Sequence, residues 1–275
     1  MATQNPRPAW GAFVKTFNDI ARHRHRYEVF RDFVTMAAIA VHNGIARDEK
    51  LEAEYLQIVG RYAKEDVTSF AHLLGQLVIL LDPEPYDVLG QLYMELELGS
   101  AHTGQFFTPP ELSELMARLS YGDALATLDK SFVTLQEPAC GAGGMVLAFV
   151  KVMLSHGHNP AERMWAHCQD VDRLAALMCY LQLSLWHVPA VVVVGNTLAH
   201  EAREVFYTPA HYLGLWDSKL RRRAEGEETQ QETQQASSAV VSEAVSPVAT
   251  ASISPKAELA RSPAPGGSVQ FDFGF

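Results

Sequence analysis

The hydrophobic positions of the chain follow two different periods in its two halves. Between about residues 10 and 98, apolar residues recur every three or four positions, as in residues 70–81, which is the spacing of an amphipathic helix. After residue 99, short apolar runs that predict strands alternate with longer runs that predict helices: 132–136, 145–156, 164–169, 172–186 and 190–194. Such alternation is typical of a parallel α/β sheet. The pattern therefore predicts four or five N-terminal helices followed by an α/β domain.

From about residue 221 the chain becomes rich in Gln, Ser, Ala, Thr and Pro, and we expect this tail to be disordered. We divide the chain into a helical domain over residues 1–98, an α/β domain over 99–218 and a low-complexity tail over 219–275. At 275 residues and 48% hydrophobic, the chain is long enough for one or two domains with a proper core.

The formal net charge of −10 is spread along the chain, and no large segment is basic. A protein that holds DNA by itself carries a strong positive field, so either its DNA contact is local or another subunit supplies it. The basic cluster Arg22-His-Arg-His-Arg26 has two interpretations, a phosphate contact or a solvated helix face.

Composition also bears on the cellular compartment. No apolar run reaches the roughly 18 residues that a membrane span needs, and the N-terminus lacks the apolar core of a signal peptide. The 3 cysteines favour a reducing cytoplasm over a disulfide scaffold. Cys168 and Cys179 fall in apolar runs and are expected to be core thiols, whereas Cys140 lies in a glycine loop. No Cys or His grouping has zinc-ligand spacing, so we predict a cytoplasmic protein without a metal site.

The glycine loop is Glu137-Pro-Ala-Cys-Gly-Ala-Gly-Gly144, between a predicted strand and a predicted helix. Its glycines allow a ligand to approach the backbone, and the helix start turns free N–H groups toward the loop. Val146 stands where a dinucleotide fingerprint has glycine, and Met145 where a P-loop has lysine. Glu137 repels a phosphate but suits a cationic or amine-bearing group. The loop therefore predicts a ligand with an amino-acid-like moiety, with a tight turn that binds nothing as the alternative.

Two polar side chains follow the next two predicted strands. Asp170 stands where an acidic residue of an open α/β sheet binds ribose hydroxyls, and its alternative role is a helix N-cap, for which Asp172 is better placed. Asn196 has a donor and an acceptor for an adenine edge, and is equally well explained as a turn residue.

A further motif, Gly104-Gln-Phe-Phe-Thr-Pro-Pro-Glu111, precedes the predicted sheet. It predicts a helix with Thr108 as N-cap, Pro109 at the first helical position and Glu111 completing a capping box. The cap does not account for the aromatic pair Phe106 and Phe107, which we expect to wall a pocket.

In this order, the motifs Gly-Gln-Phe-Phe-Thr-Pro, Glu-Pro-Ala-Cys-Gly-Ala-Gly-Gly, Gln-Asp and Gly-Asn-Thr-Leu closely resemble the modification subunits of type I restriction-modification systems, which are adenine-N6 DNA methyltransferases. The resemblance covers roughly residues 10–200. It implies a Rossmann-like, S-adenosylmethionine-dependent methyltransferase sheet after a helical N-terminal domain. It places the methionine part on the first motif and the glycine loop, the ribose on Asp170 and the adenine on Asn196, where the family usually has Asp. The implied cofactor-binding residues are Gln105, Phe106, Phe107, Thr108, Pro109, Pro110, Glu137, Ala139, Gly141, Ala142, Gly143, Gly144, Asp170 and Asn196.

The chain departs from the family at the target base. Family enzymes follow a fourth strand with Asn-Pro-Pro-Tyr or Asn-Pro-Pro-Phe, which binds and stacks on the flipped adenine. The nearest candidate here is Tyr207-Thr-Pro-Ala-His211, in which Thr208 takes the Asn position and Ala210 the aromatic one. A threonine hydroxyl has one acceptor site to spare, and alanine cannot stack.

The sheet is also shortened. The resemblance implies a sheet of about seven strands, whereas this sequence predicts three. The first strand then lies at an open edge, to be covered by a partner subunit, a second copy or the segment 207–216. We therefore expect self-association or a hetero-oligomer, with DNA contacted through a partner subunit.

Three functions remain open at this stage. The first is methyl transfer from S-adenosylmethionine to adenine N6 in DNA, and the second is a cofactor-binding accessory or decoy subunit without chemistry. The third is methylation of a different amine. The C-terminal Gln270-Phe-Asp-Phe-Gly-Phe275 resembles peptides that dock on bacterial sliding clamps, and an added strand on the open edge is its alternative.

Overall fold

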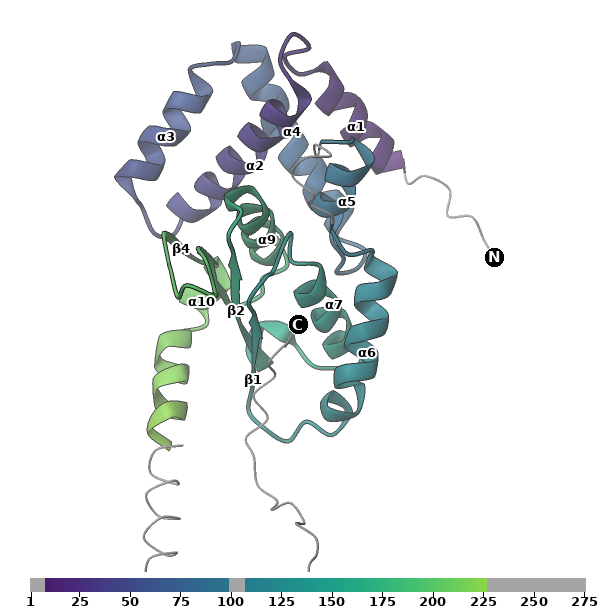
Figure 1. The fold of residues 1–275 in the computed structure, drawn as a ribbon, viewed down its shortest axis with the longest axis vertical. Helices are drawn as coiled ribbons and strands as arrows, with labels where there is room; N and C mark the ends of the chain where they lie inside the picture. The colour runs from purple at the N-terminus through teal and green to yellow at the C-terminus, as the bar shows by residue number, and fades with distance from the viewer. Residues whose placement is uncertain (1–7, 99–106, 227–275) are drawn as a thin grey trace, which may run out of the picture. The chain divides into compact units, whose positions relative to one another are not determined.

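The computed structural model describes residues 8–98 and 107–226. The described residues up to 214 belong to one unit, and those from 215 onward belong to a second, in which 216–226 are helical. The first unit contains a group of helices and a four-stranded sheet (Figure 1). Among the helices in the described ranges, none is long and apolar enough to cross a membrane.

The N-terminal part is helical, as the apolar spacing predicted. An aromatic cluster lies at the centre of this part, where the rings of Phe13 and Phe33 meet edge to face at 5.9 Å and those of Phe17 and Phe30 at 6.1 Å. All four rings are buried, which gives these short helices the tertiary packing that helices of this length need. The five helices are α1 (Pro8–Asp19), α2 (Arg26–Asn43), α3 (Glu49–Val59), α4 (Lys64–Leu81) and α5 (Val88–Glu95).

Residues 22–25 of the basic cluster lie in the turn between α1 and α2, and Arg26 is the first residue of α2. The guanidinium of Arg26 donates to the backbone carbonyls of Phe17, Ile20 and Ala21 at 2.6–3.1 Å, where α1 ends. These carbonyls lack partners within the helix, so the arginine satisfies them. The solvated-face interpretation is therefore wrong for Arg26, and this side chain is not available to a phosphate.

The sheet has the order β1-β2-β3-β4 in the part of the chain that the structure describes. The first three strands are parallel, and β4 runs antiparallel to β3. The three predicted strands and the helices between them are confirmed to within about a residue, whereas β4 was not predicted. The elements of this region are α6 (Pro110–Ala126), β1 (Val133–Glu137), α7 (Gly144–Ser155), α8 (Pro160–Arg163), β2 (Met164–Asp170), α9 (Arg173–Leu185), β3 (Ala190–Val194), β4 (Glu204–Tyr207) and α10 (Pro209–Leu213).

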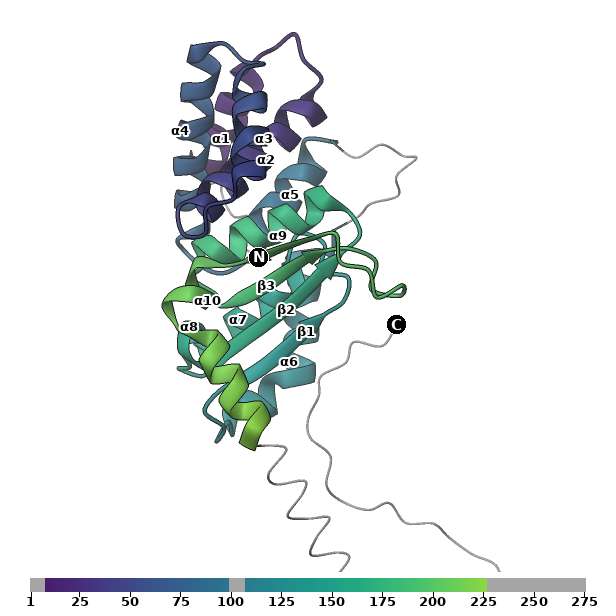
Figure 2. The same cartoon turned by 90° about the vertical axis from the view of Figure 1, so that its left-hand side faces the viewer.

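Helix α9 joins the two parts of the first unit. It packs on β2 and β3 with one side and on α2 and α5 with the other (Figures 1 and 2). Its residues 174–184 are all buried, which explains why its sequence is apolar nearly all round. The helical part and the sheet therefore share one continuous hydrophobic core.

Strand β1 pairs with β2 and lies at an edge of the sheet among the described residues, as expected for a shortened sheet. The segment 207–216 was one of three alternatives for covering this edge, and its residues 207–213 lie elsewhere, because β4 pairs with β3 and α10 also contacts β3. The prediction that this segment protects β1 is therefore wrong for residues 207–213.

Helix α6 begins one residue later than predicted. Its N-cap is Pro109, in an extended conformation and without a side-chain cap, and Pro110 is the first helical residue. A proline suits that position because the first helical N–H has no partner in the helix. The capping box of Thr108 and Glu111 is therefore wrong.

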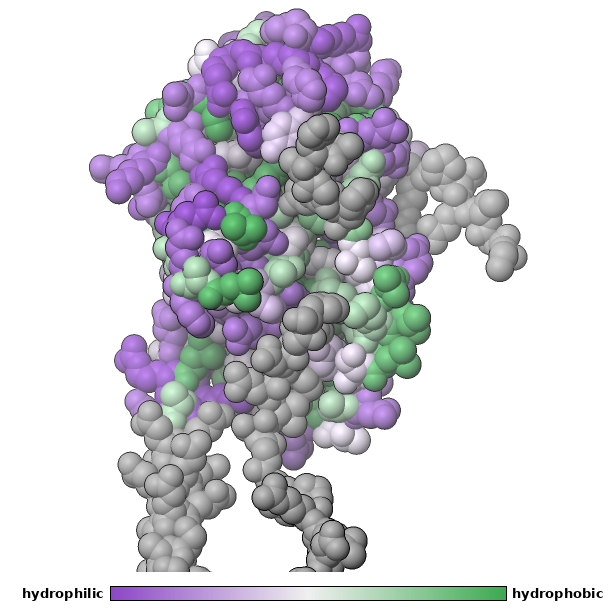
Figure 3. All heavy atoms as spheres, in the orientation of Figure 1, coloured by the Kyte–Doolittle hydropathy of each residue, from purple (hydrophilic) through white to green (hydrophobic). Residues whose placement is uncertain are grey.

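Helix α6 also leaves an apolar stripe exposed. Leu112, Leu115 and Leu119 lie three and four residues apart and are 46%, 52% and 79% exposed. They form the hydrophobic patch over α6 on the face drawn in Figure 3. The opposite side of α6 packs on α7.

Candidate cofactor site

Three of the predicted site residues lie at the carboxyl ends of the parallel strands. Glu137 ends β1, Asp170 ends β2 and Asn196 follows the end of β3. The register aligns Glu137 with Cys168 and Asp170 with Val194, so β2 and β3 end level and β1 ends two residues earlier. Neighbouring strands lie about 4.8 Å apart, which brings these side chains within reach of one small ligand.

The glycine loop is bent by two left-handed residues and is fastened to the end of β2. Gly141 has φ 52° and Gly143 has φ 94°. The N–H of Gly141 donates to Oδ2 of Asp170 at 2.8 Å, and the N–H of Cys140 donates to the carbonyl of Gln169 at 2.9 Å. The loop and the strand end therefore form a single structure.

Asp170 and Asp172 have separate roles. Asp172 is the N-cap of α9, and its carboxylate accepts from the N–H of Ala175 at 2.9 Å. The carboxylate of Asp170 accepts from the N–H groups of Gly141 and Asp172, each at 2.8 Å. The assignment of the cap to Asp172 is thus confirmed, and Asp170 is held at the edge of the site.

The site carries two carboxyl groups, of which Glu137 is buried and Asp170 is half-buried. Glu137 is 7% exposed, and its Oε1 accepts from the N–H of Ala139 at 3.2 Å. Burial raises the pKa of Glu137, and the nearby charge of Asp170 raises it further. Burial also raises the pKa of Asp170, against the hydrogen bonds that its carboxylate accepts. The two groups make the site favourable for a positive charge.

Asn196 uses its carbonyl oxygen within its own turn. Oδ1 accepts from the N–H groups of Leu198 at 3.0 Å and Ala199 at 3.2 Å, which is the turn role considered above. Its amide nitrogen has no hydrogen-bond partner among residues 8–98 and 107–226, so within these ranges it is available to donate to a ligand. Thr197, next to it, donates to the carbonyl of Pro138 at 2.6 Å and ties the β3 loop to the glycine loop.

An aromatic wall stands over the glycine loop. A Cβ on Gly141 would lie 3.3 Å from the ring of Phe107, so the ring covers this glycine directly. Tyr93 of α5 supports Phe107 edge to face at 5.3 Å. Thr108 and Pro109 are exposed, and Gln105 and Phe106 lie outside the described residues. The sequence did not single out Tyr93, because one tyrosine in an amphipathic helix resembles any core residue.

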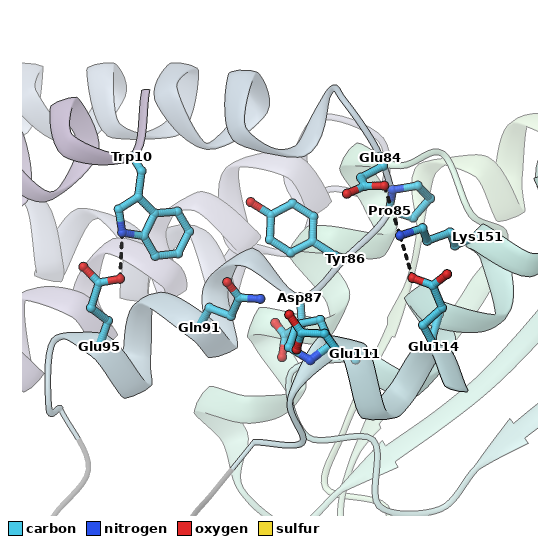
Figure 4. Close-up of a pocket in the computed structure, with 13 residues that line it drawn as sticks. Trp10, Glu84, Pro85, Tyr86, Asp87, Gln91, Glu95, Glu111, Glu114 and Lys151 are labelled. Atoms are coloured by element: carbon cyan, nitrogen blue, oxygen red, sulfur yellow. Dashed lines mark hydrogen bonds and ion pairs between the residues drawn. The ribbon is translucent and has the colours of Figure 1, made fainter. Parts of the chain in front are cut away.

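An acidic cavity of about 480 Å³ lies between α5, α6 and the first turns of α7 (Figure 4). Lys151 bridges Glu84 at 3.0 Å and Glu114 at 2.6 Å across it. Of the predicted cofactor residues, Pro110 and Gly144 line this cavity, whereas Glu137 and Asp170 do not. The cavity therefore lies beside the site formed by Glu137, Asp170 and Asn196, and the start of α7 borders the cavity.

A buried polar network behind the glycine loop was also missed. Asp87 is the N-cap of α5, and Gln182 in the middle of α9 contacts both Asp87 and Ala142. The signal in the sequence was Gln182 itself, a lone amide in an apolar helix. A buried amide of this kind needs hydrogen-bond partners.

Thr208 lies at the opposite end of the sheet from these residues. Its hydroxyl donates to the carbonyl of Val188 at 2.7 Å and accepts from the N–H of Ala190 at 2.9 Å, and the side chain is fully buried. Ala190 begins β3 and Val194 ends it, so the two ends are about 13 Å apart along the strand. The structure does not bring Thr208 close to the predicted cofactor-binding residues at the ends of β1, β2 and β3.

The three cysteines gather behind the glycine loop. Cys140, Cys168 and Cys179 are buried and free of disulfides. Hydrogen bonds to Cys140 and Cys168 raise the pKa of Cys179 well above its usual value. A Cβ on Gly143 would lie 3.1 Å from Sγ of Cys179, so this thiol packs directly under the loop. The thiols serve as small core side chains, as expected for Cys168 and Cys179.

A parallel sheet with a glycine loop after its first strand and acidic residues at its carboxyl edge defines an α/β protein of the Rossmann-like class. The family described as N-6 DNA methylase matches residues 85–221, and the chain is similar to that family over this part.

Two individual proteins show a weaker similarity. The chain is 26% identical over 107 residues to the type I restriction enzyme MpnII methylase subunit of Mycoplasma pneumoniae, an alignment that covers 38% of this chain and 18% of that protein. A solved structure from Listeria monocytogenes, assigned to the class I S-adenosylmethionine-dependent methyltransferases, has a TM-score of 0.38 and 16% identity. It covers 71% of this chain and 56% of the other, and at that TM-score it supports no conclusion. The chain thus spans less than a fifth of the methylase subunit.

Proposed function

We propose that this chain binds S-adenosylmethionine at the carboxyl edge of β1, β2 and β3 and forms the cofactor half of an adenine-N6 DNA methyltransferase. One observation carries the proposal: the hydrogen bond from Gly141 N–H to Asp170, with Phe107 lying over the same glycine. It joins three of the motifs that resemble the family into one site.

The residues present fit this cofactor. Bound S-adenosylmethionine supplies an electrophilic methyl group on a positively charged sulfur. The carboxyl groups of Glu137, which is buried, and Asp170, which is half-buried, favour a ligand with positive charge and with hydroxyl or amino donors. The free amide nitrogen of Asn196 donates to an acceptor such as an adenine ring nitrogen. Phe107 covers the loop and limits the access of water.

The same structure favours a second candidate, an accessory or decoy subunit that binds the cofactor without chemistry. Thr208, the nearest candidate in the sequence for the family's catalytic Asn, is buried and hydrogen-bonded at the far end of the sheet. A complete enzyme then needs another chain to present the target base, and β1 at the edge of the sheet offers the place for an added strand.

The expected setting follows from this proposal. DNA is contacted through a partner subunit or a second copy of the chain, in the cytoplasm. Methylation of a different amine remains the third alternative. The sliding-clamp and added-strand predictions for residues 270–275 lie outside the described residues.

Calorimetric titration with S-adenosylmethionine tests the proposal. Asp170→Ala should abolish binding, whereas Asp129→Ala, which removes an exposed aspartate before β1, should leave it unchanged. Tritiated methyl transfer to mixed-sequence DNA in the same preparation separates the two candidates. Binding with transfer identifies an enzyme, and binding without transfer identifies an accessory subunit. If the wild-type protein does not bind, both candidates fail.

A further inference from the structure

A single buried amide joins the glycine loop to the helical part of the molecule. Gln182 lies in the middle of α9 and is 0% exposed. Its Nε2 donates to the carbonyl of Ala142 at 2.8 Å and to Oδ1 of Asp87 at 2.8 Å. Its Oε1 accepts from the N–H of Leu89 at 3.1 Å. One side chain therefore holds the glycine loop and the start of α5 at the same time.

We propose that Gln182 is a positioning residue that locks the glycine loop into its binding shape and makes that shape depend on the seating of α5. The inference rests on the proposed function in one respect, namely that the loop binds the cofactor. The lock itself is a property of the protein without ligand.

The loop needs such a lock because of its own sequence. Ala142 lies between Gly141 and Gly143, which both have left-handed backbone angles. Glycine changes between positive and negative φ at little cost, so the peptide carbonyl of Ala142 can turn in more than one direction. The same peptide carries the N–H of Gly143, which donates to the carbonyl of Cys140 at 2.8 Å. The first turn of α7, whose N–H groups lack partners within the helix, follows directly. The bond from Gln182 and the bond to Cys140 therefore hold the two sides of this peptide in one direction.

Asp87 fixes the orientation of the Gln182 amide. Asp87 is 3% exposed, and its Oδ1 also accepts from the N–H of Gly90 at 2.7 Å. A Cβ on Gly90 would lie 2.0 Å from Oδ2 of Asp87, so the first turn of α5 closes tightly around the carboxyl group. A flipped amide on Gln182 would set its oxygen against two acceptors and its nitrogen against a donor. The partners therefore permit one orientation only.

Coupling of this kind works in both directions. If α5 leaves its place, Gln182 loses the partners that orient it, and the carbonyl of Ala142 is released. If a ligand orders the loop, the start of α5 becomes harder to open. The helical domain thereby sets the affinity of a site whose edge residues belong to the sheet.

Amide hydrogen exchange in the ligand-free full chain tests the lock. Gln182→Met keeps nearly the same side-chain volume and removes all three hydrogen bonds. We expect exchange in peptides covering residues 138–146 and 88–92 to become roughly tenfold faster, the factor that one lost hydrogen bond of about 1.4 kcal/mol corresponds to. Peptides covering β2 should not change. Asp87→Asn keeps the acceptor oxygen and should exchange no faster than the wild type does.

Leu77→Ala supplies the control for lost stability, because it opens a cavity in the helical core away from the loop. If it speeds exchange at residues 138–146 as much as Gln182→Met does at an equal loss of stability, the role of Gln182 is merely structural and the inference is overturned. Unchanged exchange at residues 138–146 in Gln182→Met overturns it as well.

A second measurement adds S-adenosylmethionine to the same proteins. We expect it to protect residues 88–92 in the wild type, and we expect Gln182→Met to bind about tenfold more weakly with that protection lost. If the wild type does not bind the cofactor, the proposed function fails, and the ligand-free exchange comparison still decides the lock. Binding that protects the loop of the wild type but leaves residues 88–92 unprotected overturns the coupling to α5.

Discussion

We expect two adjacent residues of the glycine loop, Gly143 and Gly144, to respond differently to substitution by alanine. Gly143 has φ 94° and lies in the left-handed region, whereas Gly144 is the first residue of α7 and has an ordinary helical φ. Substituting alanine at each position adds one methyl group to the same loop. The pair therefore separates backbone strain from the mere presence of a side chain.

The cost at Gly143 has two sources. A left-handed backbone costs an L-residue roughly 1–2 kcal/mol. The new methyl carbon would also lie 3.1 Å from Sγ of Cys179, a contact that forces a buried thiol to shift. Together we expect Gly143→Ala to lower the free energy of unfolding by about 2 kcal/mol. For a unit of this size that corresponds to a Tm lower by roughly 4–8 °C.

Gly144→Ala should behave differently. Its nearest neighbours would be Cβ and Oδ2 of Asp87 at 3.6 Å and Oγ of Ser113 at 3.7 Å, which are ordinary contacts. Alanine in a helix is more favourable than glycine by roughly 0.5–1 kcal/mol. The added methyl would face Asp87 and Ser113, and Gly144 lines the acidic cavity. We therefore expect unchanged or slightly higher stability.

Thermal unfolding by circular dichroism gives the readout. The reasoning is refuted if Gly144→Ala lowers the Tm as much as Gly143→Ala does. It is also refuted if Gly143→Ala unfolds at the wild-type temperature, since the left-handed conformation and the contact with Cys179 would then carry no cost.

Three further predictions follow from the buried polar groups. Burial raises the pKa of Asp87, so the stability that its protonated form contributes is present below the unfolded pKa of about 4 and is lost as the pH rises through the folded pKa. Asp87→Asn, which cannot ionise, should therefore raise the Tm more at pH 8 than at pH 5. A larger rise at pH 5 would contradict this. Burial also raises the pKa of Glu137 and of Asp170, and a positively charged ligand lowers both, so binding of S-adenosylmethionine near pH 5.5 should release protons, as counted by calorimetry in buffers of different ionisation enthalpy; proton uptake would contradict the proposed location. Thr208→Val leaves the N–H of Ala190 and the carbonyl of Val188 unpaired, which should cost about 1–3 kcal/mol of stability without changing cofactor affinity, and a loss of methyl transfer at full stability would instead restore Thr208 as a catalytic candidate.

The sequence predicted the elements that repeat a local pattern. The runs 132–136, 164–169 and 190–194 became strands. β3 is buried at every position and apolar on both faces, as a fully buried parallel strand is, whereas β1 alternates between buried and more exposed positions. The glycine loop and the acidic residues after the strands were visible for the same reason, since each lies beside its own strand. Strand β4 was missed because it has only four residues and is partly exposed, so its sequence shows no apolar run that would predict a strand.

Contacts between distant segments could not be read in this way. The bonds from Gln182 to Asp87 and to Ala142 span 95 and 40 residues. Nothing near Gln182 in the sequence indicates which groups it meets, although its isolation among apolar residues indicates that it must meet some. The cap of α6 failed for a smaller reason. Two adjacent prolines can each begin a helix, and local sequence does not decide between them.

The placement of Thr208 bears on what the sheet can do. A strand that presents a catalytic residue must end beside the cofactor, at the carboxyl edge of its parallel neighbours. Strand β4 runs antiparallel to β3, so its last residue, Tyr207, aligns with Val191 near the start of β3, and Thr208 follows beyond the cofactor's reach. To present Thr208 beside the cofactor-binding end of the sheet, β4 would have to leave β3, and the backbone pairing of its four residues with β3 would be lost. Among the described strands, the position beside β1 is the one from which a parallel strand would end next to Glu137. For that reason, a search for a partner that completes the enzyme should begin with chains that protect the amides of β1 from exchange.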